Sequence, residues 1–241
     1  MITAFIWGFG AAASLIIGAL LAMYVKISKR ILGLIMAFGV GVLISAVAFE
    51  LSEEAFAATH EGWSIAIGLA VGALVFFGGN VVIERMGGRK HRKPGNEAGS
   101  GLAILFGTIL DGIPESIVIG LALLHGDAIN VAMVVAVFLS NLPESIGATA
   151  GLMASGWSKL RVVGLWVTVA IVSGLASLAG FAFFASAGPI AFSFTLAFAA
   201  GALLTMLADS MMPDAFRDSG RLVGLVTTFG FGLAFLISMT N

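Results

Sequence analysis

Two prolyl-glutamate motifs lie inside apolar stretches near the middle of the chain. They read Asp-Gly-Ile-Pro-Glu-Ser at residues 111–116 and Ser-Asn-Leu-Pro-Glu-Ser at residues 140–145. An ionised carboxylate at the centre of a membrane helix costs roughly 2.5–3.5 kcal/mol on insertion scales, so such residues mark functional sites. Proline also frees a backbone carbonyl in the preceding helical turn. The motifs therefore predict a polar, oxygen-rich site at membrane depth.

The spacing within each motif places its oxygen-bearing side chains together. Asp111 and Glu115 are four residues apart, as are Ser140 and Glu144, so each pair lies on one helix face. Asp111 and Ser140 each lie about four helical turns from the short connection between the two stretches, and an antiparallel hairpin would bring them to similar depth. Carboxylates, freed carbonyls, a hydroxyl and the Asn141 amide are hard oxygen ligands that suit divalent cations.

The composition indicates a membrane protein with several spans. Of 241 residues, 59% are hydrophobic and 10% are charged, and the mean hydropathy of +1.09 is too high for one soluble core. Apolar runs of about 20 residues, the length needed to cross ~30 Å of hydrocarbon, predict an all-α polytopic protein that forms a single transmembrane domain over residues 1–241. The eight predicted spans are 3–25, 31–52, 63–86, 101–123, 128–153, 158–184, 188–213 and 221–240, with a cytoplasmic loop at 87–100 and a short polar break at 213–220.

The basic residues predict the orientation. All twelve lysines and arginines fall in four segments, which are the odd-numbered connections between eight spans. The positive-inside rule places these connections in the cytoplasm and both termini outside. The four segments are 26–30, 85–93, 159–161 and 217–221.

The chain also contains a candidate internal repeat. Residues 37–48 of the second span align without gaps with residues 197–208 of the seventh. The second span is predicted to run outward and the seventh inward, so the repeat would have inverted topology, as in many secondary transporters. We therefore expect a 3+2+3 arrangement, with two central helices between two related groups of three.

The paired motifs resemble those of the ZIP family of divalent metal transporters. In that family the fourth helix typically reads H-N-x-P-E-G and the fifth H-E-x-P-E-G, where this chain has residues 111–116 and 140–145. The end of the second span, Phe-Glu-Leu-Ser-Glu-Glu-Ala at residues 49–55, is similar to the family's H-L-L-P-E-A, and residues 209–215 resemble its acidic L-x-P-E segment. The resemblance thus extends over the whole chain.

The resemblance implies a protein that carries zinc, manganese or iron toward the cytoplasm. The expected ligands are Asp111, Glu115 and Glu144, with Ser140 and Asn141 as weaker ones. It further implies a homodimer in a plasma or bacterial inner membrane. The cation is cargo, and we expect no resident cofactor and no nucleic-acid partner. Two further acidic residues, at the ends of their spans, are candidates for the pathway or are simply solvated at the interface: Glu50 and Asp209.

The chain departs from the family at several ligand positions. Asp111 and Ser140 stand where family members generally have histidines, and Gly112 and Asn141 stand where they have an asparagine and an acidic residue. No histidine lies in a predicted span, because all three are in connections. We therefore expect one occupied cation site in place of two adjacent ones. Oxygen-dominated coordination should also narrow the preference for zinc over manganese or ferrous iron.

Three other interpretations remain open. Glu115 and Glu144 could be protonated and hydrogen-bonded between helices as a structural feature. Paired acids could also serve an intramembrane enzyme, but the G-x-G-D, H-E-x-x-H and G-x-S-x-G motifs are all missing from the sequence, and we expect no enzyme. The missing histidines leave a non-transporting or repurposed ZIP-like protein as the main alternative.

Overall fold

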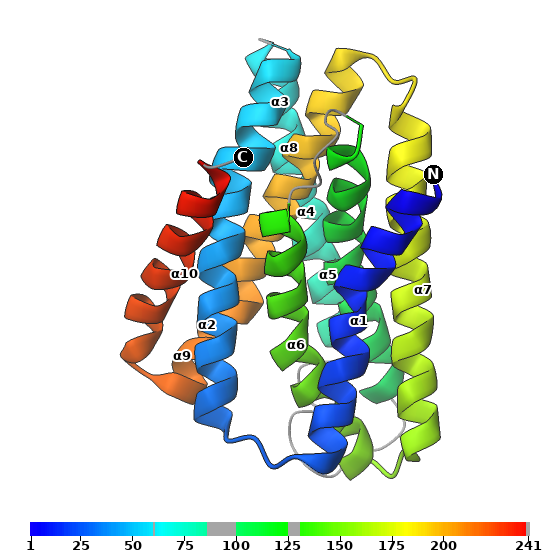
Figure 1. The fold of residues 1–241 in the computed structure, drawn as a ribbon, viewed down its shortest axis with the longest axis vertical. Helices are drawn as coiled ribbons and strands as arrows, with labels where there is room; N and C mark the ends of the chain where they lie inside the picture. Colours follow the sequence, from blue (N-terminus) through cyan, green and yellow to red (C-terminus); the bar gives the residue numbers. More distant parts are fainter. Residues whose placement is uncertain (60, 86–99, 125–130, 240–241) are drawn as a thin grey trace.

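The structure of the chain is a computed structural model that describes residues 1–59, 61–85, 100–124 and 131–239, with backbone alone for 100–106 and 131–132. These residues form a helical bundle without a strand, which confirms the all-α prediction (Figure 1). Two segments, η1 and η3, are π-helical. The elements are α1 (Ile2–Tyr24), α2 (Lys29–Ser45), η1 (Ala46–Leu51), α3 (Ser52–Ala58), α4 (Gly62–Arg85), α5 (Ser100–Ala122), α6 (Val131–Ala154), α7 (Lys159–Phe184), α8 (Pro189–Met206), η3 (Leu207–Met211), α9 (Met212–Ser219) and α10 (Leu222–Ser238).

Local capping residues set several helix ends close to the predicted boundaries. The Ser28 hydroxyl accepts a hydrogen bond from the amide of Ile31 (3.3 Å) at the start of α2. Ser158 does the same for the amide of Arg161 (3.4 Å) at the start of α7. A serine in this position satisfies a backbone donor that the first helical turn leaves without a partner. Pro189 occupies the first turn of α8, where its missing N–H costs nothing.

The segment 213–220, expected as a polar break, is instead mostly helical. Pro213 lies in the first turn of α9, where proline is tolerated. Arg217 then donates hydrogen bonds to Asp214 (2.7 Å) and Asp218 (3.1 Å). The Asp214–Arg217 pair, three residues apart, stabilises a short exposed helix. The helix ends at Ser219, and the φ of 64° at the next residue, Gly220, suits a residue without a side chain. Most of the predicted loop 87–100 lies outside the described residues.

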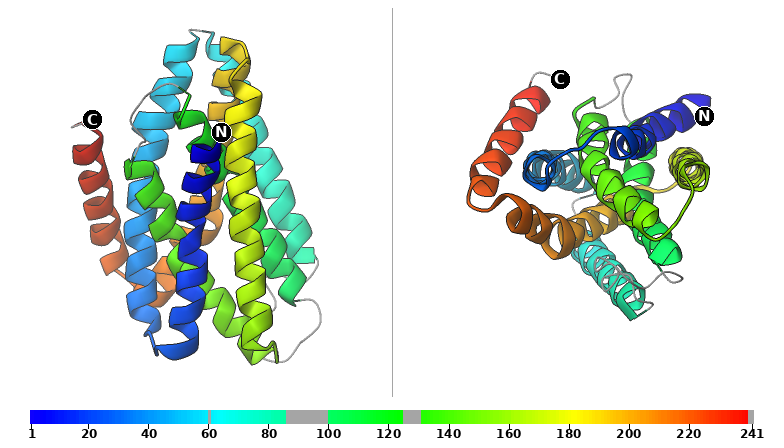
Figure 2. Two further views of the ribbon diagram at one scale, coloured as in Figure 1. Left: turned by 45° about the vertical axis from the view of Figure 1, so that its right-hand side comes forward. Right: turned by 90° about the horizontal axis from the view of Figure 1, so that it is seen from below.

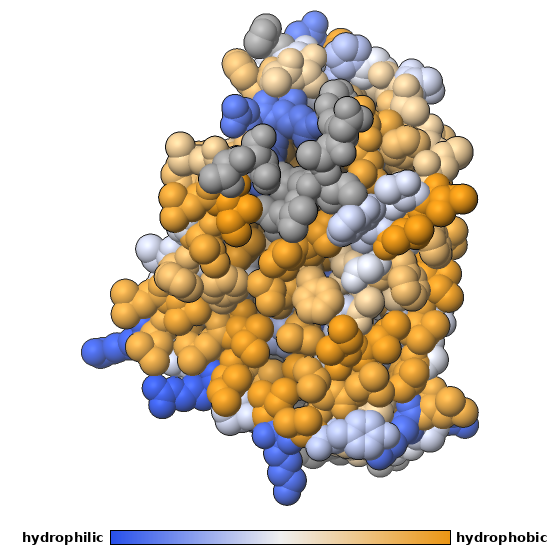
Figure 3. Space-filling view, viewed as in Figure 1, coloured by the Kyte–Doolittle hydropathy of each residue, from blue (hydrophilic) through white to orange (hydrophobic). Residues whose placement is uncertain are grey.

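Six helical stretches of the described residues are long and apolar enough to cross a membrane. This confirms the prediction of a polytopic, all-helical membrane protein at the level of length and composition. The predicted spans 101–123 and 221–240 also form helices, α5 and α10, but these two are outside the six, α10 having only 17 residues. Apolar side chains cover the middle of the surface, and hydrophilic ones gather toward the two ends (Figure 3). The six stretches are Ile2–Tyr24, Lys29–Ala58, Gly62–Arg85, Met133–Ala154, Lys159–Phe184 and Pro189–Ser219.

The helices pack in a few extensive pairs around a common core. α1 packs along α6 and α7, and α5 packs along α7, while α4 lies against α8 and α10 against α2. Seen along the bundle, α4 and α10 are peripheral, and α6 lies between α1 and α2 (Figure 2). One large cluster of buried apolar side chains joins α2, α5, α6 and α8. The two prolyl-glutamate helices are thus held at the centre of the bundle.

The α2–α10 and α4–α8 pairs pack in the same way. At each interface a glycine of one helix lies directly on a backbone carbonyl of the other, and a Cβ at any of these glycines would overlap that backbone. Small residues are common at membrane helix interfaces because they allow such close approach. The four contacts are Gly41 on the Thr227 carbonyl, Gly230 on Phe38, Gly72 on Phe198 and Gly201 on Leu69.

The two π-helical segments occur at matching places in the chain. In the gapless alignment of 37–48 with 197–208, η1 at Ala46–Leu51 corresponds to residues 206–211, and η3 spans Leu207–Met211. Each π segment leads directly into a short helix, α3 or α9. These short helices lie toward opposite ends of the bundle (Figure 1).

Candidate functional site

Both prolyl-glutamate motifs lie within continuous helices. Pro114 is inside α5 and Pro143 is inside α6, and both prolines are buried. A proline cannot donate to the carbonyl four residues earlier, which frees the carbonyls of Leu110 and Leu139 from that bond. Each helix therefore carries a glutamate and a freed carbonyl on neighbouring turns.

Glu115 of α5 is the most deeply buried charged side chain of the site. It is 1% exposed, and its Oε1 accepts a hydrogen bond from the Ser140 hydroxyl of α6 at 3.5 Å. The same hydroxyl lies 3.0 Å from the carbonyl of Val137. The side chain of Asn141, one residue further along α6, also hydrogen-bonds Glu115. Two predicted weak ligands thus contact the same carboxyl group.

The second oxygen of Glu115 has no hydrogen-bond partner. Oε2 is buried, and no donor among the described residues reaches it. A buried polar atom without a partner carries a free-energy cost of about 1–3 kcal/mol, more when the group is charged. A bound cation or a proton would remove this cost, so Oε2 is the oxygen of the site best suited to bind one.

Glu144 of α6 lies in a different environment from Glu115. It is half-buried, and it shares a side-chain hydrogen bond with Asp111 of α5. Thr108, one turn before Asp111, donates to Oε1 of Glu144 at 3.5 Å. The carboxyl groups of Asp111 and Glu144 therefore form a close pair across the α5–α6 interface.

The two groups of side chains are neighbours across the α5–α6 interface. Glu115 is within electrostatic range of both Glu144 and Asp111. All five predicted ligands consequently fall in one cluster, to which the structure adds Thr108. In their present positions, no three His, Cys, Asp or Glu side chains among the described residues are arranged to hold a metal ion. A cation bound by all three carboxylates would require rotation of their side chains.

The pairing differs from the expected register by one helical turn. We expected Asp111 and Ser140 to lie at similar depth, but Ser140 contacts Glu115, and Asp111 contacts Glu144. An antiparallel pairing centred two residues later than we assumed accounts for both contacts, that of Asp111 with Glu144 and that of Glu115 with Ser140. The assumed centre was the middle of the short connection, near Gly126, whereas both observed pairs are centred between positions 127 and 128 of the sequence.

Other hydroxyls of the motifs serve the helices themselves. Ser116 and Ser145, which follow the two glutamates, donate to the carbonyls of Gly112 (2.6 Å) and Leu142 (2.9 Å) in their own helices. Such bonds satisfy a buried hydroxyl locally. On α7, the Ser177 hydroxyl donates to the carbonyl of Ala4 in α1 at 2.8 Å. None of these hydroxyls is directed at the carboxyl cluster.

Thr108 is the site residue that the sequence interpretation missed. It is buried and lies three residues before Asp111, so both share a helix face. That spacing is a signal that could have identified it. Ser173 of α7 is also near, because its hydroxyl lies 3.6 Å from where a Cβ on Gly112 would be.

Glu50 is in η1 and Asp209 is in η3, and both are half-buried. α2 reaches the carboxyl cluster through Gly39, which packs against the backbone of Ser140. Glu50 follows Gly39 by eleven residues, or about 16 Å at 1.5 Å per residue. Glu50 is therefore a candidate for a path to the cluster and not for the cluster itself.

Comparison of the chain with known proteins yields no match, either to a protein-family model or to a curated protein.

Proposed function

We propose that this chain is a ZIP-like secondary transporter that carries a divalent cation across the membrane through the α5–α6 carboxyl cluster. The observation that carries the proposal is the buried Glu115, whose Oε2 lacks a partner beside the Asp111–Glu144 carboxyl pair. A cation bound at Glu115 would draw the three carboxylates together. Hard oxygen ligands of this kind suit zinc, manganese or ferrous iron.

The proposed topology gives the orientation of the spans, and the inward direction of transport rests on the family resemblance. Eight spans with both termini outside place the basic segments in the cytoplasm. In support, α5 and α10 are helical where spans were expected, and the start of α1 and the end of α10 lie toward the same end of the bundle as α3 (Figure 1). The proposed movement is inward. A plasma or bacterial inner membrane and a homodimer rest on the family resemblance alone.

The packing supports an inverted repeat as the transporter architecture. The α2–α10 and α4–α8 pairs use equivalent contacts: Gly41 and Gly201 align, as do Phe38 and Phe198. The π segments also fall at aligned positions, η1 between α2 and α3 and η3 between α8 and α9. A 3+2+3 arrangement would place the α5–α6 cluster near the bilayer midplane, between the two repeats.

One observation favours the alternative of a ZIP-like protein that has lost transport. Among the described residues, no three side chains of the metal-binding types converge on one position. In that case Asp111, Glu115 and Glu144 would remain as an inherited polar cluster, stabilised by protons in place of a metal ion.

Uptake into liposomes separates the two functions. Purified protein in liposomes should take up zinc or manganese, and Glu115→Gln and Glu144→Gln should each abolish uptake. Glu53→Gln is the matched control, because Glu53 is exposed on α3, away from the cluster. Uptake by the wild type and by Glu53→Gln, but not by the two cluster variants, supports transport through the cluster. No uptake by the correctly folded wild type would favour the repurposed protein.

A further inference from the structure

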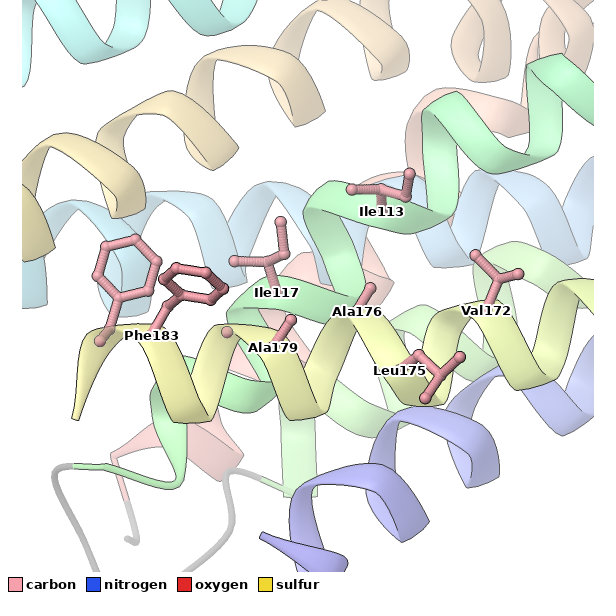
Figure 4. A pocket seen from close by; sticks show the side chains of 9 residues that line it. Ile113, Ile117, Val172, Leu175, Ala176, Ala179 and Phe183 are labelled. Atoms are coloured by element: carbon pink, nitrogen blue, oxygen red, sulfur yellow. The ribbon is translucent and has the colours of Figure 1, made fainter.

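A groove of about 430 Å³ lies between α5 and α7 on the apolar surface of the bundle (Figure 4). Every side chain that lines it is apolar. Ile113 and Ile117 of α5 face Val172, Ala176 and Ala179 of α7 across it. Its rim is open, since Leu175 is 52% exposed and Phe183 is 79% exposed.

The floor of the groove is closed by backbone contact between the two helices. Gly180 of α7 lies on the carbonyl of Ile117, and Gly120 of α5 lies on the carbonyl of Ser177. A side chain on either glycine would separate the helices. The groove is therefore shallow, because α5 and α7 are in direct contact beneath it, and it does not lead through to the carboxyl cluster.

The length and direction of the groove match one leaflet of a bilayer. From Val172 to Phe183 it follows eleven residues of α7, or about 16 Å, close to half of the ~30 Å hydrocarbon thickness. A second hollow of about 250 Å³, lined by Ala182, Phe183 and Ser186, continues it toward the end of α7. That end is opposite Lys159, which begins the helix. The groove thus runs from one membrane interface to mid-depth.

The shape and chemistry of the groove favour a single hydrocarbon chain as its occupant. Its floor is the closed contact between α5 and α7, so a chain that lies along the two helices fits its shape. Water is a poor occupant, because an apolar wall offers it no hydrogen bonds. Along α7, which is long and apolar enough to cross a membrane, acyl chains of lipids are the apolar molecules that reach the groove.

We propose that the groove binds one acyl chain of a phospholipid from the leaflet opposite the basic end of α7. The headgroup lies at the level of Ser186, and the chain end lies beside Val172 and Ile113. The chain then packs against the turn of α5 that carries Pro114 and Glu115. This inference does not depend on the proposed transport, since lipid can occupy the groove whether or not a cation binds.

Cross-linking with photoactivatable phospholipids tests the position of the chain. The full-length protein in nanodiscs is irradiated with lipids that carry a diazirine either near the ester or at the chain end, and the labelled peptides are identified by mass spectrometry. Ester-proximal probes should label residues 182–186, and chain-end probes should label residues 172–176 and 113–117. Equal labelling of α4, α10 and the groove by both probes, without order in depth, would overturn the proposal.

Groove-filling variants test whether the site retains lipid. Ala176→Phe with Ala179→Phe should remove the phospholipid that co-purifies with the wild type in native mass spectrometry. The matched control is Ala66→Phe with Ala70→Phe on the exposed face of α4, which should retain it. Ala179→Leu alone is the milder substitution if the double variant does not fold. Lipid retention by a folded groove variant, or a chain-to-chain cross-link through the groove, would contradict the proposal.

Discussion

The two prolyl-glutamate motifs have similar sequences but different surroundings. Glu115 of α5 is 1% exposed, is held by Ser140 and has one oxygen without a partner. Glu144 of α6 is half-buried and has partners on α5, namely Asp111 and Thr108. The difference suggests a division of roles. We infer that Glu115 is the fixed anchor of the site and that Glu144, with Asp111, supplies the carboxyl groups that move toward a bound cation.

The largest expected effect is that of Glu115→Gln. Loss of the anchoring carboxylate should weaken binding of zinc and manganese by at least about tenfold, or ~1.4 kcal/mol, in calorimetry. The melting temperature should stay equal or rise, because an amide removes a buried charge whose oxygen has no partner. If Glu115 were only a structural hydrogen-bond acceptor, the variant would melt at a lower temperature and bind cations as the wild type does.

A smaller effect is expected at the Asp111–Glu144 pair. Asp111→Asn and Glu144→Gln should each weaken cation binding, and the double variant should lose less than the sum of the two. Residues that share a bond show coupling of about 0.5–3 kcal/mol in a double-mutant cycle. Fully additive losses would show that the two carboxylates act independently, contrary to the assigned roles.

Restoring imidazoles should change selectivity more than affinity. Asp111→His with Ser140→His replaces oxygen ligands by nitrogen ligands, which zinc accepts more readily than manganese does. Competition assays should show a relative gain for zinc over the wild type. The absence of any relative gain would mean that these positions do not set the choice of cation.

The smallest effects concern the two prolines. Pro114→Ala and Pro143→Ala restore a donor for the carbonyls of Leu110 and Leu139, and each should stabilise its helix by roughly 0.5–1.5 kcal/mol. Cation binding should weaken more for Pro114→Ala, because that proline precedes the anchor. Equal effects of the two variants in thermal melts and calorimetry would argue that the two motifs are equivalent.

Most of the fold could be predicted from the sequence because apolar length determines membrane helices. The predicted starts of the first, third and seventh spans lie within a residue of those of α1, α4 and α8. The π segments η1 and η3 could not be predicted, since one extra residue in a helical turn leaves no mark on hydropathy. Helix α9 was missed because its polar composition resembles that of a loop, although Pro213 and the Asp214–Arg217 spacing favour a helix start.

The clustering of the five side chains could be predicted from the sequence, but their pairing could not. Four-residue spacing placed Asp111 with Glu115 and Ser140 with Glu144 on common faces, and the structure brings all four together. Which residue faces which depends on the register between α5 and α6, and a change of two residues at its centre shifts every contact by one turn. The unpartnered oxygen of Glu115 depends on side-chain rotamers, for which the sequence carries no signal.

The location of a bound cation tests the central claim most directly. A structure of the protein with zinc, with an anomalous map recorded at the zinc edge, should show a single peak at about 2.0–2.2 Å from Oε2 of Glu115. Carboxylate oxygens of Asp111 or Glu144 should complete the coordination after rotation. Two adjacent peaks, or a peak beside Glu50 or Asp209 with none at Glu115, would contradict the account.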